Sequence, residues 1–162
     1  MPVLTPIIIP MLLKYFWFLI ILVGAANAWF VQRRARPLIE QSPALQIDAN
    51  KVSITLILLI GIPSALLGII QLSAGYESPL YIFDDDLSNP YLLAAWLVMA
   101  GLRVFILYWL WFTQGLESYL AVTPIRFSKP KLLNKISGIL FIRWIITAVL
   151  IIWFISVVIS FL

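Results

Sequence analysis

The sequence predicts an all-α integral membrane protein in which four transmembrane helices form an antiparallel bundle, with both termini on the outer, non-cytoplasmic side. Its composition, four long apolar stretches and an uneven distribution of basic residues lead to this prediction. Of the 162 residues, 63% are hydrophobic and 11% are charged. Soluble domains are roughly 45–50% apolar and about 25% charged, which excludes a water-soluble globule. We therefore expect a single membrane domain covering residues 1–162.

Four apolar stretches mark the expected spans, at about 7–31, 52–72, 91–112 and 136–162. Each exceeds the ~18 residues that distinguish a membrane helix from a buried core helix. Backbone N–H and C=O groups in hydrocarbon must bond within their own segment, so these stretches should be helices. The short connections between them favour antiparallel neighbours. Residues 130–142 show amphipathic helical spacing, which indicates an interfacial helix leading into the last span.

Basic residues occur almost entirely in two of the three connections. The segments 32–51 and 113–135 carry four each, and the segment 73–90 carries none. The eight are Arg33, Arg34, Arg36, Lys51, Arg126, Lys129, Lys131 and Lys135. Because positive segments resist translocation, we expect 32–51 and 113–135 in the cytoplasm, and 73–90 outside with both termini. The net charge of +4 is then a topology signal that implies no nucleic-acid partner, and the membrane expected is a prokaryotic inner (plasma) membrane or a thylakoid.

Prolines and capping residues predict where several helices begin and end. Pro37 and Pro43 should exclude a long continuous helix from 32–51. The third span has a start signal at 88–90, where Ser and Asn precede a proline at the first helical position.

The third helix is expected to continue past the membrane to Val122, because Thr123 precedes a proline. In the fourth stretch, 19 residues follow Arg143, enough for a span, so we expect the Arg143 side chain at the headgroup level.

Arg103 is the residue that departs from the apolar pattern of the spans. It lies 12 residues after Tyr91 and 9 before Phe112, about 18 and 14 Å along a helix and therefore near the bilayer midplane. An arginine there costs roughly 2.5–3.5 kcal/mol on insertion scales, and none of the four stretches contains Asp or Glu. Two acceptors remain within the chain: Asn27, and the Leu59 carbonyl that Pro63 frees. Alternatively, a partner subunit, a lipid or a ligand supplies a carboxylate or an anionic headgroup.

The outer connection holds two further candidate contacts. Asp84, Asp85 and Asp86 complement the positive N-terminus of the third helix; the alternative is a cation site or a contact for a basic partner. Tyr81 and Phe83 belong to an apolar cluster that suits either docking of a protein partner or seating at the membrane interface.

The composition bears directly on function. The chain has no His and no Cys, and its spans offer no paired acid and base, so we expect no enzyme activity, no cofactor and no metal site. We predict a non-catalytic accessory or structural subunit, or an assembly factor, of a larger membrane protein complex. Its partners would be membrane lipids and a protein within the membrane, with a homo-oligomer as another arrangement. The alternative is a small oligomeric transporter or channel that uses Arg103 to pass an anionic or small solute.

Overall fold

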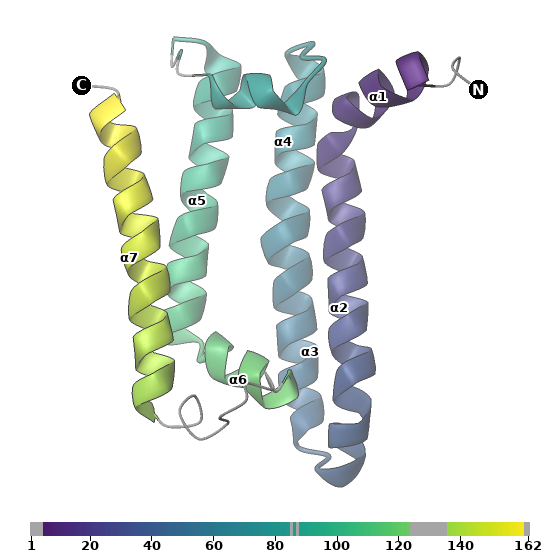
Figure 1. Ribbon diagram of the computed structural model, residues 1–162, viewed down its shortest axis with the longest axis vertical. Coiled ribbons are helices and arrows are strands. Elements are labelled where there is room, and N and C mark those ends of the chain that lie inside the picture. Colours follow the sequence, from purple (N-terminus) through teal and green to yellow (C-terminus); the bar gives the residue numbers. More distant parts are fainter. Residues whose placement is uncertain (1–4, 85, 87, 124–135, 161–162) are drawn as a thin grey trace. The chain divides into compact units, whose positions relative to one another are not determined.

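The computed structural model describes residues 5–84, 86, 88–123 and 136–160 (Figure 1). The regular elements within these residues are all helical, as predicted, and no strand occurs among them. In chain order they are α1 (Thr5–Lys14), α2 (Phe16–Gln41), α3 (Leu45–Leu56), the π-helix η1 (Ile57–Gly61), α4 (Ile62–Ser73), the 3₁₀-helix η2 (Pro79–Phe83), α5 (Pro90–Phe112), α6 (Gly115–Val122) and α7 (Ile136–Ser160).

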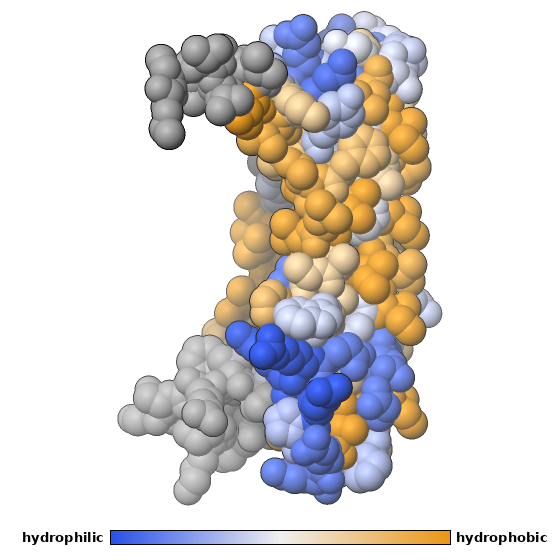
Figure 2. Space-filling model, turned by 90° about the vertical axis from the view of Figure 1, so that its right-hand side faces the viewer, coloured by the Kyte–Doolittle hydropathy of each residue, from blue (hydrophilic) through white to orange (hydrophobic). Residues whose placement is uncertain are grey.

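Three helical stretches are long and apolar enough to cross a membrane: Phe16–Gln41, Leu45–Ser73 and Pro90–Phe112. In α7 the described apolar part covers Ile139–Ile155. Few residues in the three spans are buried, namely 22%, 22% and 11% of their most apolar windows in chain order. Figure 2 shows hydrophobic side chains over much of the visible helical surface, with hydrophilic ones toward the helix ends. Exposed apolar surface of this extent needs an apolar medium, which agrees with a membrane location.

The first span differs from the expected 7–31, because the helical run breaks at Tyr15 into α1 and α2. The break is a tight turn, in which the N–H of Phe18 donates to the Tyr15 carbonyl at 3.1 Å. Just before it, the Leu13 carbonyl accepts a hydrogen bond from the side-chain amide of Gln71 at 3.2 Å. Hydropathy gives little sign of this turn, since the stretches on both sides of it are apolar apart from Lys14.

No continuous helix covers 32–51, as predicted, although only one of the two prolines lies at the break. Helix α2 continues through Pro37 to Gln41, and α3 begins at Leu45, so only a short turn that contains Pro43 separates them. Pro37 removes one donor, but helical bonding resumes immediately, because the N–H of Ser42 donates to the Leu38 carbonyl at 2.9 Å. A single missing bond near a helix end is therefore tolerated.

The second span is longer than the expected 52–72 and contains a π-helix next to its proline. Leu45–Ser73 is one helical stretch, and η1 ends two residues before Pro63. A proline ring clashes with the carbonyl four residues earlier, here Leu59, and a wider π turn relieves such a clash. The local conformation is thus set by Pro63, as a kink-forming residue predicts.

The third span begins at Pro90, one residue before the predicted limit, and ends at Phe112 as predicted. Its start is capped by Asn89, whose side-chain oxygen accepts from the N–H of Tyr91 at 3.0 Å. The predicted extension to Val122 exists as the separate helix α6. In the predicted interfacial helix, 130–135 lies outside the described residues, and 136–142 forms the first turns of α7.

Contacts divide the chain into two compact units, described separately below. The first unit comprises residues 1–29 and 54–102, and the second comprises 30–53 and 103–162. Both units take parts of α2, α5 and the Leu45–Ser73 stretch, so neither is a separate segment of the sequence. The single-domain expectation stays a prediction.

The first unit has an apolar core formed by Trp17, Leu67, Ile82 and Ala95. These residues come from α2, α4, η2 and α5, so the connection after the second span folds back onto its own helices. Gln71 is also fully buried there. Its amide donates to the carbonyls of Leu13 and Tyr76, both at 3.2 Å, while its side-chain oxygen is buried without a hydrogen-bond partner among the described residues.

Small residues allow α2 to approach the second span closely within the first unit. A Cβ added to Gly24 would lie 2.9 Å from Cγ2 of Ile60, and one added to Gly68 would lie 2.8 Å from Cε2 of Phe18. Contacts of this length leave no room for a methyl group. The small residues of these two spans therefore serve helix packing, as they commonly do in membranes.

Candidate functional site

Helix α6 folds back from the end of α5 because of two local features. Gln114 adopts the left-handed conformation, with φ of 53°, which reverses the chain direction after Phe112. The next residue, Gly115, faces the ring of Trp109, and an added Cβ would lie 2.0 Å from Cε2 of that ring. Only glycine fits there. The reversal places α6 between α3 and α7 within the second unit (Figure 1).

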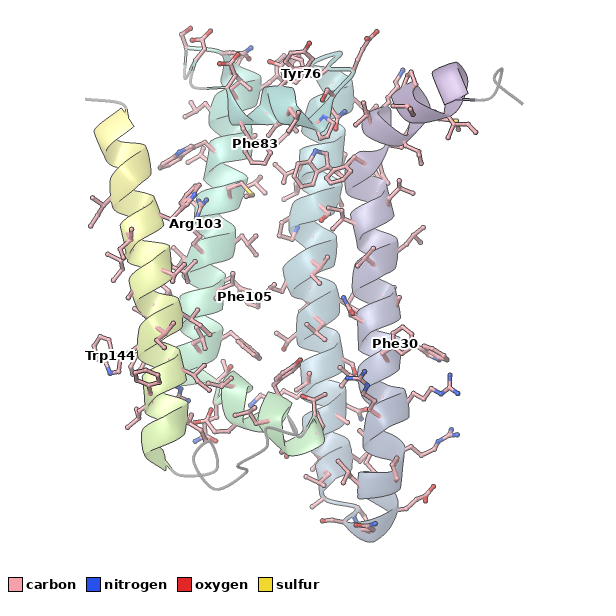
Figure 3. All side chains as sticks on the ribbon, viewed as in Figure 1. Phe30, Tyr76, Phe83, Arg103, Phe105 and Trp144 are labelled. Carbon is pink, nitrogen blue, oxygen red and sulfur yellow. The ribbon has the colours of Figure 1, made fainter. Side chains whose placement is uncertain are left out.

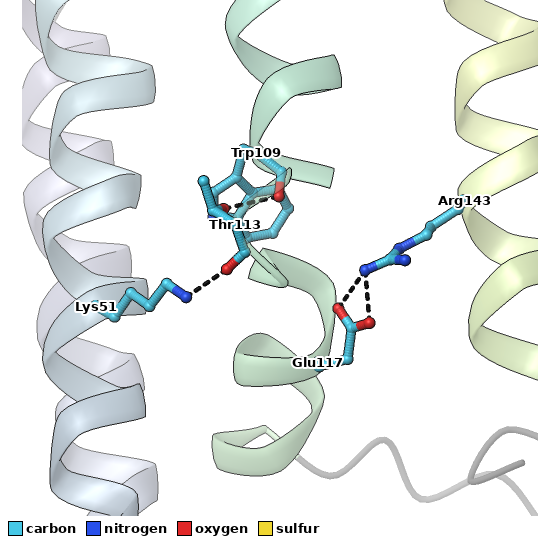
Figure 4. Close-up of polar contacts among 5 residues, drawn as sticks. All are labelled: Lys51, Trp109, Thr113, Glu117 and Arg143. Carbon is cyan, nitrogen blue, oxygen red and sulfur yellow. Dashed lines mark hydrogen bonds and ion pairs between the residues drawn. The ribbon is translucent and has the colours of Figure 1, made fainter. Parts of the chain in front are cut away.

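Polar side chains join this region to α3. The hydroxyl of Ser118 donates to Oδ1 of Asp48 at 2.7 Å, and the ammonium group of Lys51 donates to the carbonyl of Thr113 (Figure 4). Each bond joins two residues that are more than 60 positions apart in the sequence. They fix the end of α5 and the middle of α6 against α3.

An ion pair joins α6 to α7. Nη2 of Arg143 lies 2.5 Å from Oε1 and 2.7 Å from Oε2 of Glu117 (Figure 4). The Arg143 side chain is 11% exposed and that of Glu117 is 37% exposed. The guanidinium also lies 5.6 Å from the ring centroid of Trp111, whose Nε1 donates to Thr147 of α7 at 3.0 Å. We call Asp48, Lys51, Thr113, Glu117, Ser118 and Arg143 the α6 network.

The sequence did not predict the partner of Arg143. The structure pairs it with Glu117, and the expected position of its side chain at the headgroup level stays a prediction. One signal could have pointed to this pair, because Glu117 is the only acidic residue after Asp86 and lies 26 residues before Arg143. No local spacing rule connects residues so far apart.

Arg103 has a different environment from Arg143. It lies in the middle of α5 and points toward α7, where its guanidinium carbon is 3.1 Å from the ring centroid of Trp153 (Figure 3). Arg103 is half-buried, and its Nη1 is buried with no hydrogen-bond partner in the described part of the chain. The cation is thus stacked on an aromatic ring, with no carboxylate paired to it among these residues.

The two acceptors proposed for Arg103 both belong to the first unit, whereas Arg103 belongs to the second. Asn27 is exposed on α2, and Pro63 follows η1. Their pairing with Arg103 therefore stays a prediction.

The acidic residues of the connection have local roles where they are described. Asp86 accepts hydrogen bonds from both the backbone N–H and the hydroxyl of Ser88, at 3.1 and 2.5 Å. Asp85 lies outside the described residues, and Asp84 is exposed. These bonds are typical of a turn that leads into a helix, and a cation site or a contact for a basic partner at these residues stays a prediction.

The two aromatic candidates of the connection pack partly against their own unit. Tyr81 lies 5.8 Å from the Tyr76 ring, and Phe83 lies 6.3 Å from that of Trp17, measured between centroids. They are still 55% and 54% exposed. Each ring is therefore partly packed and partly exposed, and its docking to a partner or seating at the interface stays a prediction.

The two arginines differ in their partners. In the α6 network Arg143 has a charged partner in Glu117. The bonds of Lys51 and Asp48 join the end of α5 and α6 to α3, so the network holds helices together. Arg103 instead presents a cation that an oxyanion could approach. Within residues 5–84, 86, 88–123 and 136–160, no group of three or more His, Cys, Asp and Glu side chains could hold a metal ion.

Comparisons of the chain with protein-family models, curated proteins and solved structures gave no match.

Proposed function

We propose that this protein is a non-catalytic accessory or structural subunit, or an assembly factor, of a larger membrane protein complex. The observation that carries the proposal is the environment of Arg103. Its guanidinium is stacked on Trp153 in the middle of an apolar span, and Nη1 is buried without an acceptor among the described residues. A second subunit with a carboxylate in its own membrane helix would supply the missing charge.

The cost of placing Arg103 in the membrane exceeds the stabilisation from its stacking on Trp153, which favours a counterion from another protein. Stacking on Trp153 contributes about 0.5–2 kcal/mol, while an arginine in the centre of a membrane helix costs at least roughly 2.5–3.5 kcal/mol and an unsatisfied buried donor about 1–3 kcal/mol. Arg103 is 13 residues from the start of α5 and 9 from its end, about 20 and 14 Å. Lipid phosphates lie beyond those distances, so a carboxylate on a neighbouring helix is the better partner.

We propose further that α7 is the fourth span, with both termini and the connection 73–90 outside and with 32–51 and 113–135 in the cytoplasm. The exposed Arg33, Arg34 and Arg36 at the end of α2 support this orientation. We expect a prokaryotic plasma membrane or a thylakoid. In right-side-out vesicles a membrane-impermeant maleimide should label Glu77→Cys and leave Ser42→Cys unlabelled; the reverse pattern would overturn the orientation.

Purification from native membranes in a mild detergent, followed by identification of co-migrating proteins, tests the assignment. Arg103→Leu should release the companion subunit while the isolated chain keeps or gains stability, because an uncompensated charge is removed. Val104→Leu, at the exposed neighbouring position, is the matched control and should retain the companion.

A charge exchange makes the test specific. Arg103→Glu should abolish assembly, and a Glu→Arg or Asp→Arg change in a membrane helix of the companion should restore it. A monodisperse homo-oligomer without companions, with anion uptake into liposomes that Arg103→Leu abolishes, would contradict the proposal and favour a transporter or channel.

A further inference from the structure

Helix α1 exposes every side chain whose burial the structure describes, although its Leu13 carbonyl accepts a hydrogen bond from Gln71. The seven consecutive residues 8–14 are all exposed, among them Ile9 at 56%, Met11 at 62% and Leu12 at 49%. Successive residues of an α-helix are rotated by about 100°, so seven of them point in every direction around the axis. Every side of this part of α1 therefore carries at least one exposed side chain, from Leu13 at 38% to Met11 at 62%.

The side chains that α1 exposes are almost entirely apolar. In 8–14 only Lys14 is charged, and the other six residues are isoleucine, leucine, methionine and proline. A helix that is apolar all round is stable only when it is enclosed by an apolar environment. A partner protein or a second copy would cover one side and leave the others in water, whereas lipid acyl chains surround a helix on all sides.

Helix α1 is too short to cross a membrane. Its 10 residues extend about 15 Å, half of the ~30 Å hydrocarbon core. It is also separated from α2 by the turn at Tyr15 and leaves the direction of α2 at an angle (Figure 1). It is therefore no extension of the first span.

Hydrogen bonds fix the level of the C-terminal end of α1. Gln71 donates to the carbonyls of both Leu13 and Tyr76, and the Tyr76 hydroxyl accepts from Asn89, the residue before α5, at 2.8 Å. The end of α1 thus lies where two spans end or begin. Tyrosines gather at this level, and Tyr side chains prefer the membrane–water boundary. The long Lys14 side chain can reach the headgroups from here.

We propose that α1 is immersed in the lipid of one leaflet, just below the headgroups, and anchors the start of the first span there. The hydrogen bond from Gln71 to Leu13 supports such immersion, since a carbonyl at a helix end in lipid needs a donor from the protein. The proposal is independent of the proposed function, because it uses no contact of Arg103.

The absence of cysteine from the chain allows a direct test in the full-length protein. Single variants Ile9→Cys, Met11→Cys and Leu12→Cys sample three directions around α1. Each carries a nitroxide label in vesicles of phosphatidylcholine and phosphatidylglycerol. Power saturation then compares collision with oxygen, which concentrates in lipid, with collision with a water-soluble nickel chelate. Val104→Cys is the lipid control and Ser42→Cys the water control.

We expect oxygen collisions to exceed nickel collisions at all three positions, with ratios between that of Val104→Cys, which lies deeper in the span, and that of Ser42→Cys in water. A ratio close to that of Ser42→Cys at any position would overturn the proposal, because that side of α1 would be in water. Low collision with both reagents at one position only would also overturn it, since it would show one face packed against protein or a second copy.

Discussion

Nη2 of Arg143 lies within 2.7 Å of both carboxylate oxygens of Glu117, across 26 residues of sequence. The pair connects two helices of the second unit, one short and one long. Because Arg143 is 11% exposed and Glu117 is 37% exposed, the pair is neither a surface ion pair nor a deeply buried one. Its energetic contribution should fall between those two classes.

Glu117→Gln should therefore destabilise the protein by about 1–3 kcal/mol, between the values for exposed and buried pairs. The variant leaves the Arg143 guanidinium without its charged partner. Reversible unfolding in mixed micelles measures the change, and Glu40→Gln, at an exposed position of α2, is the control. A double-mutant cycle with Arg143→Gln should give a favourable coupling energy. Equal stability of Glu117→Gln and Glu40→Gln would show that the pair contributes nothing.

Gly115→Ala should lower stability by about 2 kcal/mol or more, because the new methyl group would overlap the ring of Trp109. Gly101→Ala is a matched control in α5, where an added Cβ meets nothing within 4 Å. There the change should be neutral or stabilising by up to ~1 kcal/mol, as expected from helix propensity. The order of the two melting temperatures decides the question, and a Gly115→Ala protein at least as stable as the Gly101→Ala protein would refute the contact.

Gln114→Gly should stabilise the protein by about 0.5–1 kcal/mol. Gln114 has a positive φ of 53° and its side chain caps no backbone group of α6. A non-glycine residue in this region costs about 1–2 kcal/mol relative to glycine, although glycine loses part of this gain through the entropy of the unfolded chain. Gly75→Ala provides the opposite test, because φ is 71° and the site is sterically open. It should destabilise, and thermal unfolding of both variants should show shifts of opposite sign.

Gln71→Leu should cost about 1–3 kcal/mol, since it leaves the carbonyls of Leu13 and Tyr76 without their common donor. Loss of the unpartnered side-chain oxygen offsets part of this cost. Amide hydrogen exchange should rise at the end of α1 and at Tyr76 before it rises elsewhere. Gln46→Leu removes an exposed hydrogen bond and should change neither measurement. Unchanged exchange at α1 in the Gln71→Leu protein would show that the link is not formed.

The sequence predicted the helical class and the limits of α5 well, and the reasons are local. Apolar runs longer than a span report helices directly, and the capping residue Asn89 with Pro90 marks a helix start. The proline rule failed at Pro37, because a helix near its end tolerates one missing donor while bonding resumes at Ser42. Hydropathy also did not reveal the turn at Tyr15, because the stretches on both sides are apolar apart from Lys14.

The contacts of the candidate site were harder to predict. Arg103 was identifiable because a charge within an apolar run is unusual. Its contact Trp153, however, lies 50 residues later in the sequence, and the contact depends on how α5 and α7 pack. The Glu117 partner of Arg143 depends on a chain reversal at Gln114, a residue with no strong preference for the left-handed conformation. Such pairs follow from tertiary structure, and no spacing rule in one helix reveals them.

The bond between Gln71 and Leu13 has a consequence for the order of biogenesis. During synthesis the N-terminal helix emerges 58 residues before the side chain that holds its end. Its final depth can be set only after the second span has entered the bilayer. Nascent chains arrested before residue 71 has left the ribosome should therefore place this helix more variably than chains arrested later.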